Sequence, residues 1–129
     1  MKFKYRSTMN IIKQIFYLAN ISIFILYLSP CSLLGYLINK DCKLQPQFTG
    51  DFIVSTNHVI AFALLSLIGL NAFKKNLKQV IIYLIFISIF LELCHLFIPE
   101  RSFQIIDLFG NISGVILSFL IFKIIIYSR

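Results

Sequence analysis

The chain has 129 residues, of which 59% are hydrophobic and 13% charged, and its mean hydropathy is +0.89. An ordinary soluble domain is about half apolar and a quarter charged, so this composition excludes that class and indicates a membrane protein. The 14 Phe and 6 Tyr, with only 5 Gly and 3 Pro, exclude collagen-like and disordered chains. The net charge of +7 does not indicate a nucleic-acid surface, because long apolar runs separate the basic residues into groups.

Four apolar windows are long enough to cross a bilayer, whose hydrocarbon core of about 30 Å requires about 20 helical residues. They cover residues 14–38, 56–73, 77–98 and 105–127. Residues 55–57 offer capping side chains to the second helix, and Pro99 marks the end of the third. The first window begins like a signal peptide, but its apolar stretch continues past Pro30. We therefore expect a retained helix that Pro30 bends.

The basic residues predict the orientation, because Lys and Arg are retained in the cytoplasm during insertion. With both termini inside, three cations lie on the outer side, namely Lys40, Lys43 and Arg101. Nine lie on the cytoplasmic side, namely Lys2, Lys4, Arg6, Lys13, Lys74, Lys75, Lys78, Lys123 and Arg129. Short links make neighbouring helices antiparallel. The sequence thus predicts an all-α membrane protein of the cell membrane, a compact antiparallel bundle of four transmembrane helices forming one domain over residues 1–129.

The three cysteines are odd in number and have no C-x-x-C spacing, so neither a disulfide framework nor a zinc site is predicted. Cys31 and Cys94 lie in apolar runs and are expected to be packing residues. Cys42 lies in a polar loop and is expected to be exposed, with no obvious disulfide partner. We predict no metal and no cofactor.

All five acidic residues fall on the outer side of this topology. Asp41, Asp51 and Glu100 lie in loops, whereas Glu92 and Asp107 lie in the outer halves of helices. Glu92 is about 9 Å below the outer end of its helix, at 1.5 Å per residue. A lone buried carboxylate there costs several kcal/mol, so Glu92 requires a partner.

Polar residues at helical spacing surround these two carboxylates. The third helix carries Ser88, Glu92 and His95 on one face, and the fourth carries Asp107, Asn111, Gly114 and Ser118. We expect the two faces to meet, with Gly114 and Ser118 allowing the third and fourth helices to approach. Arg101 lies in the turn between them, and His58 lies in the first outer turn of the second helix. The candidate site, here called the polar cluster, comprises His58, Glu92, His95, Arg101, Asp107 and Asn111.

At these residues the sequence resembles the VanZ-like family of small bacterial membrane proteins. The family pattern has a His opening the second helix, Glu-x-x-Gln near the end of the third, an aromatic-x-Pro-x-Arg turn, and Asp-x-x-x-Asn-x-x-Gly opening the fourth. The matching residues are His58, Glu92 to His95, Phe97 to Arg101, and Asp107 to Gly114. Val54 and Ser55 replace an Asp-Lys pair of the family, which removes a charge pair from the mouth of the site. His95 stands where the family has Gln, which adds a titratable ring.

The resemblance implies an integral membrane protein of the bacterial cell envelope. The family is named for a protein linked to resistance to glycopeptide antibiotics, notably teicoplanin, and no settled reaction accompanies the name. Fold and motif alone do not transfer that resistance to this chain. The leading hypothesis is a noncatalytic protein whose polar cluster binds a polar headgroup, a glycopeptide-related or lipid-linked ligand, or a partner. Arg101 would then provide the anion contact.

Other functions stay open. The polar cluster can be a structural hydrogen-bond network that holds the helices together. An intramembrane enzyme acting on a lipid or lipid-linked glycan would use Glu92 or Asp107 as general base and His95 or His58 as proton shuttle, although no nucleophile motif such as G-x-S-x-G occurs. Transport is disfavoured because the first helix has no acidic residue. The oligomeric state is not predicted, since lipid-facing and partner-facing apolar residues look alike in a sequence.

Overall fold

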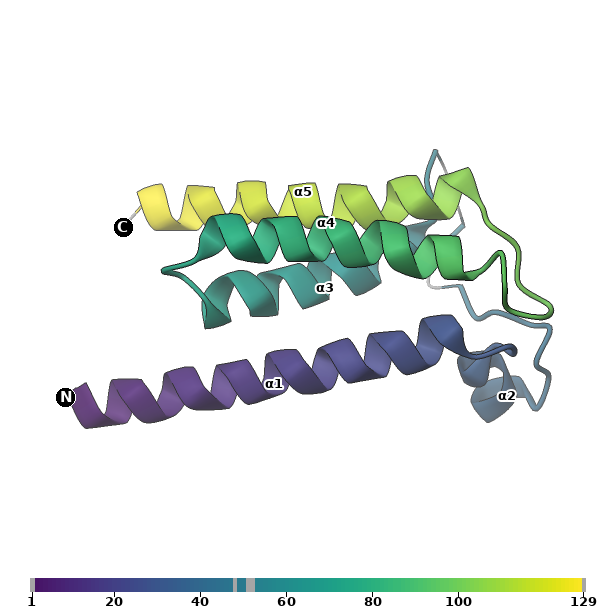
Figure 1. Cartoon of the computed structure of the whole chain (residues 1–129), viewed down its shortest axis with the longest axis horizontal. Coiled ribbons are helices and arrows are strands. Elements are labelled where there is room, and N and C mark those ends of the chain that lie inside the picture. The colour runs from purple at the N-terminus through teal and green to yellow at the C-terminus, as the bar shows by residue number, and fades with distance from the viewer. Residues whose placement is uncertain (1, 48, 51–52, 129) are drawn as a thin grey trace.

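All regular structure is helical in the part of the chain that the computed structural model describes, namely residues 2–47, 49–50 and 53–128, with residues 2–7 as backbone alone (Figure 1). The helices are α1 (Lys2–Leu28), α2 (Leu33–Asn39), α3 (Thr56–Ala72), α4 (Leu77–Cys94) and α5 (Ile105–Tyr127). The all-α prediction is confirmed. Outside the described part lie the side chains of Lys2, Lys4 and Arg6 and all of Asp51 and Arg129.

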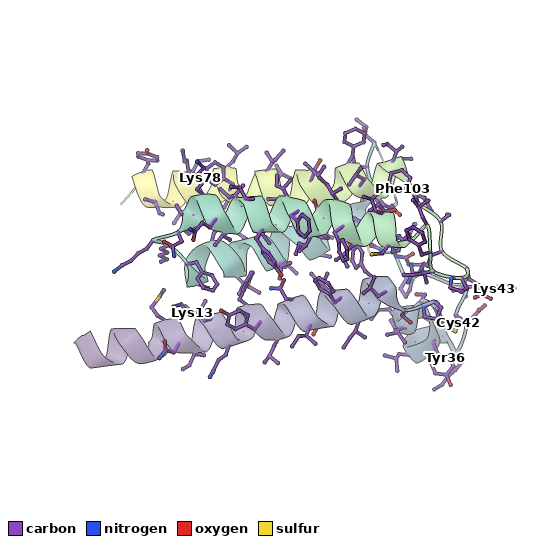
Figure 2. All side chains as sticks on the ribbon, viewed as in Figure 1. Lys13, Tyr36, Cys42, Lys43, Lys78 and Phe103 are labelled. Carbon is purple, nitrogen blue, oxygen red and sulfur yellow. A yellow bond between two sulfur atoms is a disulfide. The ribbon has the colours of Figure 1, made fainter. Side chains whose placement is uncertain are left out.

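The four longer helices run side by side along the long axis of the molecule, each antiparallel to the one before it in the chain (Figure 1). α3 and α4 lie between α1 and α5 and contact both of them. Both termini lie at one end, here called the terminal end, together with the turn 73–76. The opposite end, here called the polar end, carries α2, the described residues 40–47 and 53–55 that follow it, and the turn 95–104 (Figure 1). Lys78 lies at the terminal end, and Cys42 and Lys43 lie at the polar end (Figure 2).

Three helical segments are long and apolar enough to cross a membrane, namely Thr8–Leu28 within α1, α4 and α5. α3 has 17 residues, which corresponds to about 26 Å at 1.5 Å per residue. It is also well enclosed by its neighbours, since Phe62, Leu65 and Leu70 are buried. The outer faces of the molecule carry exposed large apolar side chains such as Leu18 and Phe86, as expected of surfaces that contact lipid. A fourth crossing by α3 and the side on which the termini lie remain predictions.

The expected single helix over residues 14–38 is wrong. α1 begins at Lys2 and ends at Leu28, and α2 begins only at Leu33. Pro30 has no backbone N–H and disfavours helical conformation in the residue before it, so it breaks the helix instead of bending it. Ser32 then caps α2, because its side chain accepts a hydrogen bond of 3.1 Å from the backbone N–H of Gly35.

The third expected helix is four residues shorter than the window 77–98. α4 ends at Cys94. Beyond it, His95, Leu96 and Phe97 donate backbone hydrogen bonds of 3.0–3.2 Å to carbonyls three residues earlier. This tighter winding is typical of a last helical turn. In this turn the side chain of His95 lies between the helices and is buried.

A disulfide joins Cys31 and Cys42, whose Cα atoms are 5.1 Å apart. The expectations that Cys31 packs as a free thiol and that Cys42 has no partner are therefore wrong. The break at Pro30 places Cys31 in a loop, and the chain beyond α2 folds back over it, with Ser32 N donating to Cys42 O at 3.2 Å. Gly35 permits this close crossing, because a Cβ there would collide with the carbonyl oxygen of Leu44. Cys94 is a free cysteine.

The small residues of α5 pack against α3, whereas we expected them to pack against α4. A Cβ at Gly114 would lie 2.9 Å from the backbone nitrogen of Ala63, and Ser118 Oγ donates a 2.8 Å hydrogen bond to the carbonyl of Ala63. Ser88 of α4 uses its hydroxyl within its own helix, donating to Ile85 O at 2.7 Å. Small residues indicate that a helix packs closely against a neighbour, but their spacing does not identify which helix that neighbour is.

Candidate functional site

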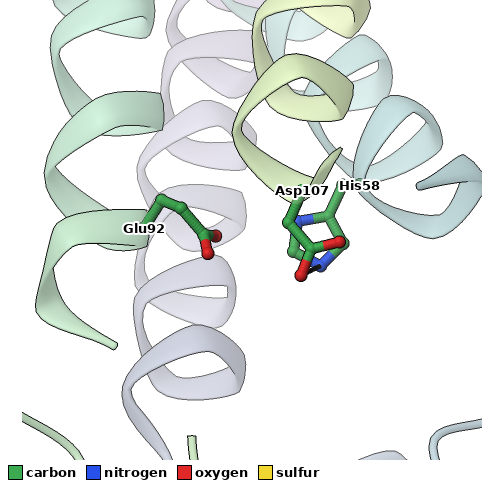
Figure 3. A group of neighbouring side chains, drawn as sticks. All are labelled: His58, Glu92 and Asp107. Carbon is green, nitrogen blue, oxygen red and sulfur yellow. Dashed lines mark ion pairs between the residues drawn. The ribbon is translucent and has the colours of Figure 1, made fainter. Parts of the chain in front are cut away.

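The candidate site lies at the polar end, where polar side chains of α1, α3, α4 and α5 come together and most of them are buried. His58 of α3, Glu92 of α4 and Asp107 of α5 turn toward a common space (Figure 3). His58 and Glu92 are buried, as are His95 and Asn111, and Asp107 is partly buried. The structure thus brings five members of the polar cluster together, whereas the sixth, Arg101, bonds elsewhere, as described below.

A close approach of α5 to α3 positions the α5 side chains beside His58. A Cβ at Gly110 would lie 2.8 Å from the carbonyl oxygen of Ser55 and 3.0 Å from Cβ of His58, so a larger residue would separate the helices. The backbone N–H of Ser55 also donates to Ile106 O at 3.4 Å. Asp107 and Asn111 lie one helical turn apart on this face.

Tyr27, His58 and Asn111 form a buried triangle of hydrogen-bonding groups. The Tyr27 hydroxyl donates to Asn111 Oδ1 at 2.8 Å and lies 3.0 Å from His58 Nδ1. His58 Nδ1 is also 3.0 Å from Asn111 Oδ1. The triangle ties the end of α1 to α3 and α5, and all three groups lose access to water on folding.

The orientation of Asn111 determines which ring nitrogen of His58 carries a proton. Asn111 Nδ2 donates to the carbonyl of Ser88 at 3.3 Å, so Oδ1 must be the atom that faces His58. Because this oxygen only accepts hydrogen bonds, His58 Nδ1 bonds to it as a donor. His58 Nε2 then faces Asp107 Oδ2, 3.6 Å away.

Glu92 is fully buried, yet only one of its two oxygens has a partner. Oε1 accepts a hydrogen bond of 2.9 Å from the backbone N–H of Gln104 and lies 3.4 Å from His95 Nδ1. Oε2 has no hydrogen-bond partner among the residues that the structure describes. Glu92 therefore has the partner that its depth requires, in His95 and the turn before α5, but one carboxylate oxygen is left unsatisfied.

His95 connects α4 to the end of α1. Its Nε2 lies 3.0 Å from the carbonyl oxygen of Tyr27 and must donate, since a carbonyl only accepts. Its ring also stacks on the Tyr27 ring, with centroids 5.9 Å apart. His95 therefore holds both Glu92 and Tyr27 in place.

Arg101 bonds to backbone carbonyls, and none of the ion pairs among the described residues includes it. Nε donates to Ser29 O at 3.2 Å, and Nη2 lies 3.4 Å from Leu26 O and 3.5 Å from Cys31 O. The guanidinium thus caps the carbonyl end of α1, where a positive charge is favourable. The alternative pairing with Glu100 is not formed. Because the three carbonyls are neutral, the charge of Arg101 has no counter-ion in these contacts.

Sequence reasoning missed Tyr27. Its hydroxyl has partners 31 and 84 residues away along the chain, and its ring is central to the site. The residues around Tyr27 in the sequence do not distinguish it from two other tyrosines outside the site. Tyr17 is exposed, and Tyr83 donates a 2.6 Å hydrogen bond to Asn20 Oδ1 nearer the terminal end. The only local signal is its position one turn before Pro30, at the expected bend.

Two cavities adjoin the site. One, of about 470 Å³, is mostly polar and is lined by residues that include Lys43, Arg101, Gln104 and Asp107. The other, of about 230 Å³, is mostly apolar and is lined by residues that include Leu26, Ala61 and Leu64. Ser32, Gln45, His95 and Arg101 line both cavities. The polar cavity and the apolar cavity are therefore neighbours, and the shared lining includes one histidine and one arginine.

One group in the described part of the chain has the donor atoms to hold a metal ion. His58, Glu92 and Asp107 each offer one ligand atom, and these atoms lie within 4.8 Å of one another (Figure 3). A nitrogen and two carboxylate oxygens from three different helices therefore face a single point. No sequence spacing indicates this set.

Nearly the whole chain matches one family model. The model, VanZ/LLP1, matches residues 3–126, a range that contains Tyr27 and every member of the polar cluster. The comparisons with curated proteins and with solved structures found no match.

Proposed function

Because the chain belongs to the VanZ/LLP1 family, we propose that it is an integral membrane protein of the bacterial cell envelope that binds a lipid or lipid-linked ligand at its polar end. In this proposal a single transmembrane domain over residues 1–129 crosses the membrane four times, with both termini in the cytoplasm. The ligand has an anionic headgroup and an apolar tail. The observation that carries the proposal is the junction of a polar and an apolar cavity at His95 and Arg101.

The apolar cavity suits a hydrocarbon chain. Leu34 and Leu64 line it and are also exposed on the outer surface, so the cavity borders the face that lipid would contact. A tail in this cavity would exchange lipid contacts for protein contacts, and the specificity would come from the polar groups at its inner end. Tyr27, His58 and His95 line that inner end.

The polar cavity suits an anionic headgroup. Lys43 and Arg101 line it, and the Arg101 charge is bonded only to neutral carbonyls among the described residues. A phosphate oxygen beside Arg101 would gain a charge-assisted hydrogen bond. Asp107 and Glu100 also line this cavity, and they would favour headgroups that carry hydroxyl or amine donors in addition to the phosphate.

The proposed orientation rests on the distribution of charge and sulfur. The turn between α3 and α4 carries Lys74 and Lys75 at the terminal end, where cations retained in the cytoplasm are expected. The disulfide lies at the polar end, which fits an oxidising outer compartment. The four longer helices alternate in direction (Figure 1), so a chain that crosses four times brings both termini to the same side.

A second candidate function is an enzyme acting on the same ligand. The unsatisfied Glu92 Oε2 and the His58–Asp107 pair next to a polar cavity are the groups that favour it. A carboxylate or imidazole can serve as general base there. Turnover of a bound lipid that is lost in Glu92→Gln would support this function over binding alone.

Native mass spectrometry of the purified chain tests ligand binding, with EDTA present throughout. We expect retention of phosphatidylglycerol over phosphatidylcholine, and about tenfold weaker retention in Arg101→Gln, since a charge-assisted contact is worth about 1.4 kcal/mol or more. Ala61→Phe should also lower retention, because the ring would fill the apolar cavity. Lys78→Gln removes a charge at the terminal end and serves as the matched control.

A lipid-linked cell-wall precursor carries the same phosphate and chain chemistry as the phospholipid. Competition between the two in the same measurement identifies the preferred source. Equal retention of both phospholipids in the wild-type chain, unaffected by Ala61→Phe, would contradict the proposed function.

A further inference from the structure

We propose that His58, Glu92 and Asp107 bind one divalent transition-metal ion, such as Zn²⁺ or Mn²⁺, between α3, α4 and α5 (Figure 3). The inference concerns the same end of the molecule as the lipid ligand but does not depend on that ligand. It rests on the separation of the donor atoms, on an unsatisfied buried oxygen and on the hydrogen bonds that orient His58.

The separations fit ligands of one ion. With metal–ligand bonds of about 2.1 Å, two ligands of a tetrahedral ion lie about 3.4 Å apart. His58 Nε2 and Asp107 Oδ2 are 3.6 Å apart, and all three donor atoms lie within 4.8 Å of one another. The Glu92 carboxylate already points toward the other two side chains (Figure 3). A small rotation of this carboxylate would bring its oxygen to bonding distance of a shared ion.

The unsatisfied oxygen Oε2 of Glu92 is the second observation that favours a bound cation. Glu92 has no exposed surface, and no group in the described part of the chain donates a hydrogen bond to this oxygen. An unsatisfied carboxylate oxygen in such surroundings is costly unless a proton or a cation neutralises it. Arg101, the nearest guanidinium in the cluster, donates to the carbonyls at the end of α1. A metal ion between the three side chains would neutralise the Glu92 carboxylate and lie between it and the Asp107 carboxylate.

The hydrogen bonds of His58 prepare its other nitrogen for a metal. Nδ1 donates to Asn111 Oδ1, whose orientation is held by the bond from Asn111 Nδ2 to Ser88 O. Nε2, the other ring nitrogen, faces Asp107 Oδ2 at 3.6 Å. A cation bound between these two atoms would be held by both of them. Metal-binding histidines commonly donate their second ring N–H to a fixed oxygen in this way.

The donor set indicates the class of ion. One imidazole and two carboxylates suit Zn²⁺, Mn²⁺ or Fe²⁺, whereas Cu⁺ prefers sulfur and Ca²⁺ takes six to eight oxygen ligands. Three protein ligands leave at least one position open. Asp107 lines the polar cavity, so that position is accessible to water or to a phosphate oxygen of a bound headgroup.

Metal titration of the full chain tests the inference. The protein is purified in detergent without a polyhistidine tag, in a Cys94→Ser background, stripped with EDTA and titrated with Zn²⁺ by calorimetry. We expect one ion per chain, with affinity lowered about 100-fold in Glu92→Gln and in Asp107→Asn. We expect a loss of about tenfold in Asn111→Ala, which removes the oxygen that orients His58 but none of the three proposed ligands. Asp41→Asn removes an exposed carboxylate at the polar end, outside both cavities, and should leave the affinity unchanged.

A second measurement uses the unsubstituted protein, so it tests the metal site even if one of the variants fails to fold. Electron paramagnetic resonance of bound Mn²⁺ should show coupling to one histidine nitrogen. Binding of much less than one ion per chain, or unchanged affinity in both carboxylate variants, would overturn the inference and leave a doubly protonated His58 paired with Asp107. Lipid retention is measured in EDTA, so failure of the metal site and failure of the lipid proposal are separate results.

Discussion

The two ends of the helix assembly are held together by different chemistry. At the terminal end, aromatic rings pack edge to face, as Phe16 does with Phe73 at 5.5 Å and with Tyr83 at 6.2 Å, and Lys13 lies over the Phe73 ring. At the polar end, the contacts are buried hydrogen bonds and close backbone approaches. Aromatic packing tolerates small displacements, whereas a buried polar network depends on each of its partners. The polar end should therefore be far more sensitive to single substitutions.

The largest difference is expected from matched glycine substitutions. In Gly114→Ala the added Cβ would lie 2.5 Å from Val59 O and 2.9 Å from Ala63 N, both backbone atoms. α3 and α5 must then separate, and we expect a loss of about 3 kcal/mol in the free energy of unfolding. In Gly69→Ala the Cβ meets the Phe16 ring, which can move, so we expect about 1 kcal/mol.

Unfolding in detergent, followed by circular dichroism, measures both glycine effects. Gly50→Ala is the control, because none of the described residues has an atom within 4 Å of the added carbon. Equal losses in Gly69→Ala and Gly114→Ala would mean that the two ends do not differ in the way described.

Removal of the disulfide should weaken the polar end alone. Cys31 and Cys42 are 11 residues apart, and closing a loop of this length stabilises a fold by about 3 kcal/mol in the chain-entropy description. We expect a loss of that size in Cys31→Ser/Cys42→Ser, with the aromatic contacts of the terminal end retained.

The same cysteines report the orientation of the chain. In whole cells, mild reduction followed by a membrane-impermeant maleimide should label Cys42 if the polar end faces outward. Labelling only after the membrane is permeabilised would place the polar end in the cytoplasm and contradict the proposed topology.

The smallest difference is expected from two tyrosine substitutions. Tyr27→Phe removes the hydroxyl that bonds to Asn111 and lies beside His58, both buried, and should cost about 2 kcal/mol. Tyr83→Phe removes a bond to Asn20 from a residue that is 39% exposed, and should cost about 0.5 kcal/mol. Tyr17→Phe is a surface control for the same detergent unfolding measurement. A cost for Tyr83→Phe that equals or exceeds that for Tyr27→Phe would contradict the contrast between the ends.

Local periodicity determined the parts of the site that lie on one helix. Glu92 and His95 are three residues apart and Asp107 and Asn111 are four apart, so each pair shares a helix face whatever the fold. The apolar windows likewise predicted α3 and α5 to within one residue, because burial of a hydrophobic helix depends on the composition of that segment. The sequence also placed a disruption of the first helix at Pro30, but it predicted a bend where the structure has a complete break between α1 and α2.

Tertiary structure alone decided which faces meet. Tyr27 joins the site from α1, and Cys31 finds Cys42 only because the chain folds back after α2. Gly114 contacts α3 instead of α4, and Arg101 caps α1 instead of meeting a carboxylate. These contacts link segments far apart in the chain, and in a molecule with apolar residues on every helix many pairings bury similar areas. The choice among them depends on shape and on buried polar partners, which no single segment encodes.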